Sequence, residues 1–154
     1  MLEINIVDIE DPLHEIVRSG GAFLMVPVDG DDPAIFICRR FADALTQDEL
    51  RAVVAHEEGH YVADHLNAVG SGIHTNQEFE FAADDYAVEK MGSAKDLLSA
   101  IYKTAEFTMN VVLPETLGDD WDDEVRAVAR ELTDAVLNPR IDRLKARLHS
   151  ESQT

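Results

Sequence analysis

Five consecutive residues near the middle of the chain, His56-Glu57-Glu58-Gly59-His60, combine groups that bind metals with a group that can move protons. The two histidines are four residues apart, and side chains at this spacing share one face of an α-helix, with about 6 Å between their Cβ atoms. Two imidazoles placed in this way can bind one metal ion, most commonly zinc. Glu57 follows the first histidine, so its carboxylate would lie near the ion and could take a proton from bound water. The segment therefore predicts a metal site with a general base.

The sequence around this segment favours a helix. Apolar residues recur at helical spacing from Leu50 onward, which predicts a helix with one buried side. Thr46 followed three residues later by Glu49 is the pattern of a capping box and predicts a helix over about 47–67. Gly59 lowers the helix propensity by about 1 kcal/mol. It also permits another backbone to approach closely, which a buried metal site would use.

A catalytic zinc site needs a third protein ligand and one open position. Acidic residues recur in the segment 78–92, in which apolar residues follow a helical period up to Gly92, so the segment predicts a helix over 77–91. Glu80 and Asp84 are four residues apart and share a face of that helix. One carboxylate could bind the metal while the other accepts a hydrogen bond from a ligand histidine. We expect the remaining acidic residues to solvate the helix; these are Glu78, Asp85 and Glu89.

The histidine motif and the segment 79–88 together resemble the gluzincin zinc metallopeptidases, which carry His-Glu-x-x-His followed by Glu-x-x-x-Asp on a second helix. The most similar group contains the CAAX prenyl endopeptidases, their heat-shock and mitochondrial quality-control relatives, and the small minigluzincins. The resemblance extends over about residues 22–148. It implies that Glu80 is the third zinc ligand, that Asp84 supports a ligand histidine and that Glu57 is the catalytic base.

A late segment, Asn138-Pro139-Arg140, is similar to the His-Pro…Arg segment of the same family, with Asn138 in place of the histidine. Arg140 could support a ligand carboxylate, stabilise a developing oxyanion, or lie on the surface of a helix. His74 and Tyr86 are further candidates for contact with an oxyanion or substrate. His74 follows the first metal helix in a predicted loop, where a solvent-exposed histidine is the alternative.

Composition predicts one globular domain, spanning residues 1–154 and zincin-like by the resemblance. The net charge of −18 argues against binding of nucleic acid or of an anionic membrane surface, because the attraction to phosphate would have the wrong sign. The single cysteine, Cys38, excludes a disulfide within the chain and lies in an apolar run, where burial is expected. We find no signal-peptide pattern and no apolar stretch of membrane-spanning length, so the expected location is the cytoplasm, without membrane insertion.

The predicted fold class is α+β, with a small N-terminal sheet packed on a mainly helical body. Three segments read as strands, Leu2–Ile6, Phe23–Val28 and Ile35–Cys38, which predicts a hairpin or a three-stranded sheet. A turn at 29–33, a short helix over 12–18 and a linker over 113–120 are also expected. The pair Asn138-Pro139 predicts the start of a last helix. The longer predicted helices are 47–67, 77–91, 94–110, 121–137 and 139–149.

The motifs and the resemblance together imply a zinc-dependent endopeptidase that binds one Zn²⁺ per chain and hydrolyses peptide or protein substrates. The resemblance also implies that an edge strand, either 23–28 or 35–38, pairs with an extended substrate. Three alternatives remain open: a latent proenzyme whose C-terminal helices cover the cleft, a catalytically silent metal-binding regulator, and a metal-dependent hydrolase with a non-peptide substrate. The sequence leaves the substrate and the oligomeric state undetermined.

Overall fold

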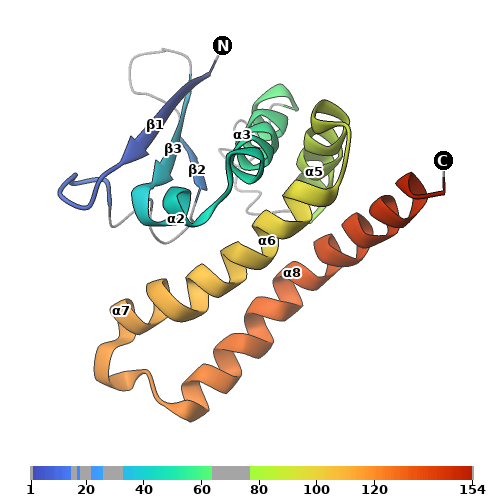
Figure 1. The fold of residues 1–154 in the computed structure, drawn as a ribbon. Helices are drawn as coiled ribbons and strands as arrows, with labels where there is room; N and C mark the ends of the chain where they lie inside the picture. The colour runs from blue at the N-terminus through green and yellow to red at the C-terminus, as the bar shows by residue number, and fades with distance from the viewer. Residues whose placement is uncertain (1, 15–16, 18–21, 26–32, 64–76, 154) are drawn as a thin grey trace.

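A three-stranded sheet forms the N-terminal part of the protein, and most of the remaining described chain is helical (Figure 1). The computed structural model describes residues 2–14, 17, 22–25, 33–63 and 77–153. This arrangement confirms the predicted α+β class. No helix in these ranges is both long enough and apolar enough to cross a membrane.

The sheet consists of β1 (Glu3–Val7), β2 (Ala22–Met25) and β3 (Ala34–Cys38) in the order β1-β3-β2. β1 runs parallel to β3, and β2 runs antiparallel to it, with Phe23 opposite Phe36. Of the two predicted arrangements, the structure therefore has the three-stranded one. β3 is paired on both sides, and its alternating apolar residues are almost completely buried, including Cys38 as expected. Most of the predicted turn at 29–33 lies outside the described residues, as do residues 15, 16 and 18 of the short helix predicted over 12–18.

A short helix, α2 (Arg39–Ala44), leads from the sheet to the metal-motif helix α3 (Gln47–Val62). The capping box is confirmed, because the Thr46 hydroxyl accepts a hydrogen bond from the Glu49 amide and the Glu49 carboxylate accepts one from the Thr46 amide. α3 ends at Val62 instead of 67, and residues 64–67 lie outside the described chain.

The second predicted metal helix is present as α5 (Gln77–Met91) and ends at Gly92, whose positive φ of 79° suits glycine at a helix terminus. α6 (Lys95–Phe107) continues as a π-helical turn over Thr108–Val112. The predicted linker at 113–120 is wrong, because α7 (Leu113–Leu117) and a 3₁₀ turn (Gly118–Asp120) occupy it. Pro114 allows α7 because a proline in the first helical turn lacks only an N–H that has no intrahelical partner.

The prediction of two C-terminal helices separated at Asn138-Pro139 is also wrong. One helix, α8 (Asp123–Glu151), runs through Pro139, and its N-cap is Asp122 rather than Asn138. An interior proline costs about 3 kcal/mol. Ile141 and Leu144 are buried against α6 directly after it, and burial of such side chains contributes about 1.5–3 kcal/mol each. Packing therefore outweighs the local signal to end the helix.

α3 lies between two apolar clusters and contributes to both. The first cluster joins the sheet to α2, α3 and the π-helical turn; its members include Ile35, Ile37, Phe41, Val53, Phe107 and Val112. The second cluster joins α3 to α5, α6 and α8; its members include Ala55, Ala87, Leu97, Leu98, Ile101, Ile141 and Leu144. The histidine motif is thus carried on an element that is fixed from two sides.

Candidate metal centre

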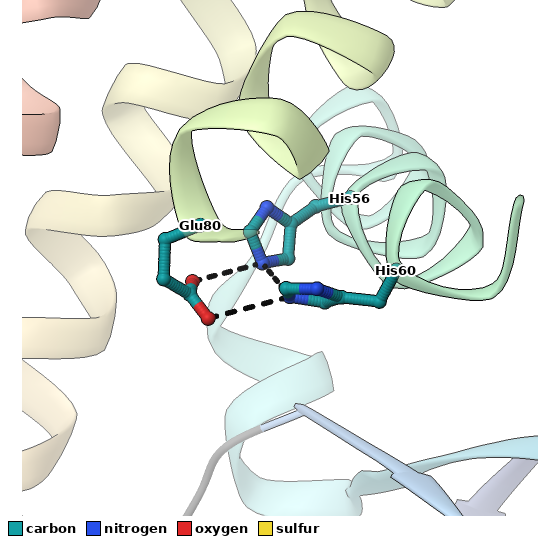
Figure 2. Close-up of side chains that lie close together, drawn as sticks. All are labelled: His56, His60 and Glu80. Atoms are coloured by element: carbon teal, nitrogen blue, oxygen red, sulfur yellow. Dashed lines mark hydrogen bonds and ion pairs between the residues drawn. The ribbon is translucent and has the colours of Figure 1, made fainter. Parts of the chain in front are cut away.

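A close approach of α3 and α5 brings the two predicted metal motifs together. A Cβ atom added at Gly59 would lie 2.8 Å from the Cα atom of Ala83 and 3.1 Å from Cβ of Tyr86. The first distance is shorter than carbon atoms tolerate and the second is tighter than an ordinary contact, so the helices cross at this separation because residue 59 has no side chain. The close approach expected for Gly59 is therefore present, and it places Glu80 of α5 over the histidines of α3 (Figure 2).

Three side chains with metal-binding atoms converge at this crossing. Nε2 of His56 and Nε2 of His60 are 3.1 Å apart. The Glu80 carboxylate places Oε2 at 3.3 Å from His56 Nε2 and Oε1 at 3.4 Å from His60 Nε2. His56 is buried, and His60 and Glu80 are half-buried. The three predicted ligands are therefore in one cluster, and within the described residues they form the group of side chains that could hold a metal ion.

The donor distances fit zinc. Two ligands bound tetrahedrally at 2.0–2.1 Å from a zinc ion are about 3.3–3.4 Å apart. The two histidine nitrogens are 3.1 Å apart, and each lies 3.3–3.4 Å from one oxygen of the Glu80 carboxylate, so the spacing of the three side chains is of the size that zinc requires. Two imidazole nitrogens and one carboxylate are also a common ligand set of catalytic zinc.

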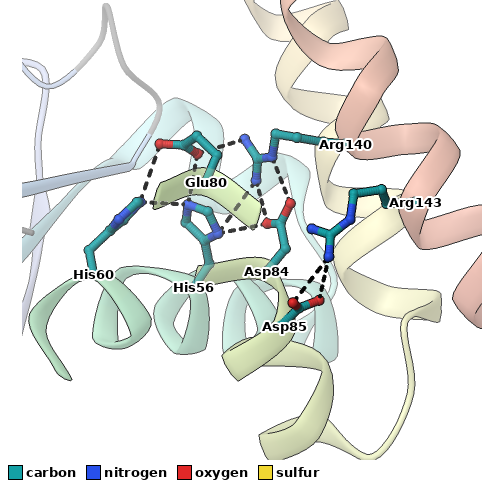
Figure 3. Close-up of polar contacts among 7 residues, drawn as sticks. All are labelled: His56, His60, Glu80, Asp84, Asp85, Arg140 and Arg143. Carbon is teal, nitrogen blue, oxygen red and sulfur yellow. Dashed lines mark hydrogen bonds and ion pairs between the residues drawn. The ribbon is translucent and has the colours of Figure 1, made fainter. Parts of the chain in front are cut away.

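Asp84 fixes the orientation of His56 from the far side of the ring (Figure 3). His56 Nδ1 is 2.8 Å from Asp84 Oδ1, and both side chains are almost fully buried. Donation from Nδ1 to the carboxylate leaves the lone pair of Nε2 directed at the ligand cluster. Asp84 therefore has the position that was predicted for the residue supporting a ligand histidine.

Arg140 reaches this cluster from α8 and binds the carboxylates of Glu80 and Asp84 on α5 (Figure 3). Its Nε and Nη2 atoms donate to Asp84 at 2.9 and 2.7 Å, and Nη1 lies 3.1 Å from Glu80 Oε2. A guanidinium suits this role because its planar donors match a carboxylate in two places. These contacts place Arg140 in the cluster, so its surface alternative is wrong.

Burial and charge act in opposite directions on the titratable groups of the cluster. Burial alone would lower the pKa of His56, but its bonds to Asp84 and Glu80 outweigh this effect and raise the pKa to about 9. For Glu80 and Asp84, burial is likewise outweighed, because hydrogen bonds from the histidines and Arg140 hold the pKa of each carboxyl below its ordinary value. Glu57 behaves differently: burial raises the pKa of its carboxyl above 4.5.

The remaining predicted site residues have different outcomes. Glu57 is buried next to His56, in electrostatic contact with His56 and His60. Tyr86 packs against Gly59, and Lys90 lies over its ring at 6.0 Å from the centroid. Its contact with substrate stays a prediction. His74 lies outside the described residues.

Sequence reasoning missed Arg143, which forms a second bridge between α8 and α5. Its Nη2 atom is 3.1 Å from Asp85 Oδ2, and its guanidinium lies 4.2 Å from the centroid of the Phe81 ring. Asp85 is exposed as predicted, but it has this ion-pair partner. A signal for this bridge was present in the sequence. Arg140 and Arg143 are three residues apart on one helix, and the acids at 84 and 85 with which they pair are adjacent on another.

Residues 22–78 match the family model of Peptidase family M48. The matched segment runs from β2 through α3 to the start of α5, so it includes both histidines and Glu57 and ends two residues before Glu80. Comparisons with curated proteins and with solved structures give no match. The family match supports a metallopeptidase, and the geometry of Glu80, Asp84 and Arg140 is an independent observation from the part of the chain beyond the match.

Proposed function

We propose that the protein is a zinc-dependent metalloendopeptidase in which His56, His60 and Glu80 hold one zinc ion. The observation that carries this proposal is the convergence of two histidine nitrogens, 3.1 Å apart, and the Glu80 carboxylate, which places one oxygen 3.3 Å from His56 Nε2 and the other 3.4 Å from His60 Nε2. The match to a peptidase family over the helix that carries the histidines supports it.

Zinc bound by these residues would supply Lewis acidity, polarising a peptide carbonyl and lowering the pKa of a water ligand to about 7. Glu57 acts as the general base that takes a proton from the attacking water and then delivers it to the leaving amine. Its burial favours this exchange, because a carboxyl with a raised pKa both accepts and returns a proton more readily near neutral pH.

Asp84 and Arg140 position the ligands. Asp84 holds His56 in the tautomer that leaves Nε2 free for the ion, and Arg140 holds Asp84 and Glu80 in place. Between the roles of carboxylate support and oxyanion stabilisation, these contacts favour carboxylate support, since all three donor nitrogens of Arg140 face carboxylates.

The substrate proposed here is a peptide or protein bound in extended form along β2. Of the two candidate strands, β3 is central and already paired on both sides, so it cannot pair with a substrate. β2 is at an edge of the sheet and packs next to α3. An extended peptide could therefore add to β2 by main-chain hydrogen bonds beside the histidine motif.

The test separates metal binding from catalysis. Glu57→Gln keeps the size of the side chain and removes the base, so we expect unchanged zinc content and a loss of peptide cleavage of about 10²–10⁴-fold. Glu58→Gln is the matched control: Glu58 pairs with Lys90 outside the ligand cluster, and the variant should cleave like wild type. Zinc is measured by elemental analysis and cleavage with a fluorogenic peptide library. A Glu57→Gln protein with wild-type turnover would exclude Glu57 as the base.

The same measurements address the alternatives. A catalytically silent regulator binds zinc but gives no cleavage in the wild type. A latent proenzyme gives cleavage only after its C-terminal part is trimmed. A hydrolase with a non-peptide substrate gives no peptide cleavage in the wild type or in Glu57→Gln.

A further inference from the structure

Tyr61 directly follows His60 on α3, and its side chain is 40% exposed beside the candidate metal centre. A single exposed tyrosine is ordinary on a protein surface and needs no explanation by itself. Tyr61 is distinguished by its place on the helix. It comes four residues after Glu57, the proposed base, and side chains at this spacing share one face, with about 5–6 Å between their Cβ atoms. Helical side chains also lean toward the N-terminus, which brings the ring back toward Glu57.

The ring of Tyr61 points to the side of α3 that faces the sheet. Gly59 contacts α5, and residues two apart in a helix of about 3.6 residues per turn point about 160° away from each other. Leu50 and Val54 are eleven and seven residues before Tyr61, two spacings that return to nearly the same face, and both pack against the cluster that contains the sheet. Figure 1 agrees, because the sheet and α5 lie on opposite sides of α3.

This row of α3 is covered at its start and open beside the metal centre. Leu50 and Val54 are half-buried against the first apolar cluster, whereas Tyr61, one turn beyond Glu57, is exposed. β2 packs next to α3, and the proposed substrate adds to the free edge of β2. A peptide that extends along this edge and across the metal centre would therefore replace solvent over the ring of Tyr61.

The charges around the ring favour a cationic substrate side chain. Within the described residues, β2, the second half of α3 and the part of α5 before Lys90 contain no lysine or arginine. Two cations reach this region and both are paired, Lys90 with Glu58, and Arg140 with Glu80 and Asp84. An acidic side chain of a substrate would thus lack a partner. A cationic one would meet the electron-rich face of the ring in a protein of net charge −18.

We propose that Tyr61 is a specificity-determining residue whose ring packs against an arginine or lysine side chain of the substrate, close to the bond that is cleaved. The inference rests on the proposed peptidase function. Tyr61 takes no part in the chemical step, because the proposed ligands and base are other residues. Its contribution is a preference of about fivefold for a cationic over an aliphatic side chain, the size expected for a cation over an exposed ring.

The test measures binding in the zinc-loaded Glu57→Gln protein, which leaves the peptide intact. The probes are three fluorescent peptides of about eight residues that differ only at one central position, which is arginine, leucine or glutamate. We expect the arginine peptide to bind about fivefold more tightly than the leucine peptide in fluorescence anisotropy, and the glutamate peptide to bind most weakly.

Two substitutions and one control separate the ring from its surroundings. Tyr61→Ala should reduce the preference for arginine over leucine to about one, and Tyr61→Phe should keep it, because phenylalanine has the same ring face. Tyr102→Ala is the matched control: Tyr102 is 43% exposed on α6, outside this row, and its removal should leave all three affinities as they were. Each variant should bind the same amount of zinc as the parent protein.

Failure of this inference can be distinguished from failure of the proposed function. Equal affinities for the three peptides, tighter binding of the leucine peptide, or a preference for arginine that survives Tyr61→Ala would each overturn the role of Tyr61 even in an active peptidase. Absence of binding by all three peptides would overturn it as well. A preference that depends on Tyr61, in a protein whose wild type cleaves no peptide, retains the role in binding and rejects the peptidase.

In the active enzyme, the loss should appear in substrate selection and not in the chemical step. Tyr61→Ala should raise KM for the arginine peptide by about fivefold at an unchanged kcat, so that the ratio of kcat/KM between the arginine and leucine peptides falls to about one. A fall in kcat by the same factor for all three peptides, together with a lower zinc content, would indicate damage to the metal ligands and contradict a role in specificity.

Discussion

His56 is the residue of the candidate metal centre in which burial and charge most clearly oppose each other. Its burial disfavours a positive charge, yet the carboxylates of Asp84 and Glu80 raise its pKa to about 9. In the metal-free protein at neutral pH, His56 is therefore protonated and satisfies both carboxylates. A metal ion must replace that proton, because only the neutral imidazole has a lone pair for coordination.

We expect zinc binding at pH 7 to release about one proton from His56. The pKa of about 9 sets the pH window: below it the proton is present and must leave, and above it the proton is already absent. The proton that His56 releases should therefore disappear as the pH rises through 9, while a water ligand of zinc begins to lose its own proton near pH 7. Isothermal titration calorimetry at pH 6 in buffers of different ionisation enthalpy measures the release below the pKa of the water ligand. Zinc binding at pH 6 without proton release would contradict the prediction.

Arg140 should contribute to metal affinity without touching the ion. We expect Arg140→Gln to weaken zinc binding by about 10–100-fold, because Glu80 and Asp84 lose the group that holds them in position. Competition with a chromogenic chelator measures the affinity. Arg143→Gln is the control. Arg143 is on α8, as Arg140 is, but it pairs with the exposed Asp85 of α5, so its removal should change zinc affinity less than threefold, or about 0.6 kcal/mol.

Among single residues, the sequence predicted those site residues that are neighbours on one helix. The pairs His56/His60 and Glu80/Asp84 are each four apart, and helical spacing alone fixes their common face. Arg143 was missed because its partners lie on another element, 58 residues away from it at Asp85. Such a contact depends on how α8 lies against α5, which local spacing does not determine.

Among the elements, the crossing of α3 and α5 depends on one missing side chain. Gly59→Ala should destabilise the protein by about 1–3 kcal/mol, although alanine favours helices more than glycine. The added Cβ would meet the backbone of Ala83, which cannot move aside as a flexible side chain would. Urea denaturation measures the change.

Gly92 offers the contrast to Gly59. It has open space around its Cβ position but a φ of +79°. Asparagine tolerates that backbone conformation, so Gly92→Asn should be nearly neutral and Gly59→Asn strongly destabilising. Similar effects at both positions would contradict the close approach of the helices.

Glu49 links the start of α3 to α6 and should make stability depend on pH. Burial alone would raise the pKa of its carboxyl, but bonds from Lys103, Ser99 and the Thr46 amide lower it below 4.5. Its stabilising contribution is therefore present above pH 4.5 and lost as the pH falls through the lower folded pKa. Glu49→Gln should cost about 2 kcal/mol at pH 7, and this difference should shrink toward pH 3. A difference that is constant with pH would exclude the ionised carboxylate as its source.

The elements whose limits were predicted correctly carry their signals locally, as with the Thr46 cap of α3 and Gly92 after α5. The errors lie where tertiary packing opposes such signals. Asn138-Pro139 has the local pattern of a helix start, but Ile141 and Leu144 bury against α6 and keep α8 continuous. The segment at 113–120, predicted as a linker, is helical and connects α6 to α8, which pack side by side.

The whole molecule contains 31 acidic residues but only 13 lysines and arginines, so negative charges repel one another in the folded chain. We expect the free energy of unfolding to rise when NaCl increases from about 20 mM to about 300 mM, because the Debye length falls from roughly 20 Å to below 10 Å. Urea denaturation at each salt concentration tests this. A decrease with salt would show that ion pairs such as Arg140–Asp84 outweigh the general repulsion.

The bridge from Arg140 to Asp84 has a consequence for the order of biosynthesis. The three ligand residues and Asp84 are all made before the arginine, which follows Asp84 by 56 residues. A nascent chain can therefore display every metal-binding group while it still lacks the cation that restrains two of its carboxylates. If the proposed zinc site is correct, tight binding of the metal would therefore begin only when α8 has been synthesised and has folded back onto α5.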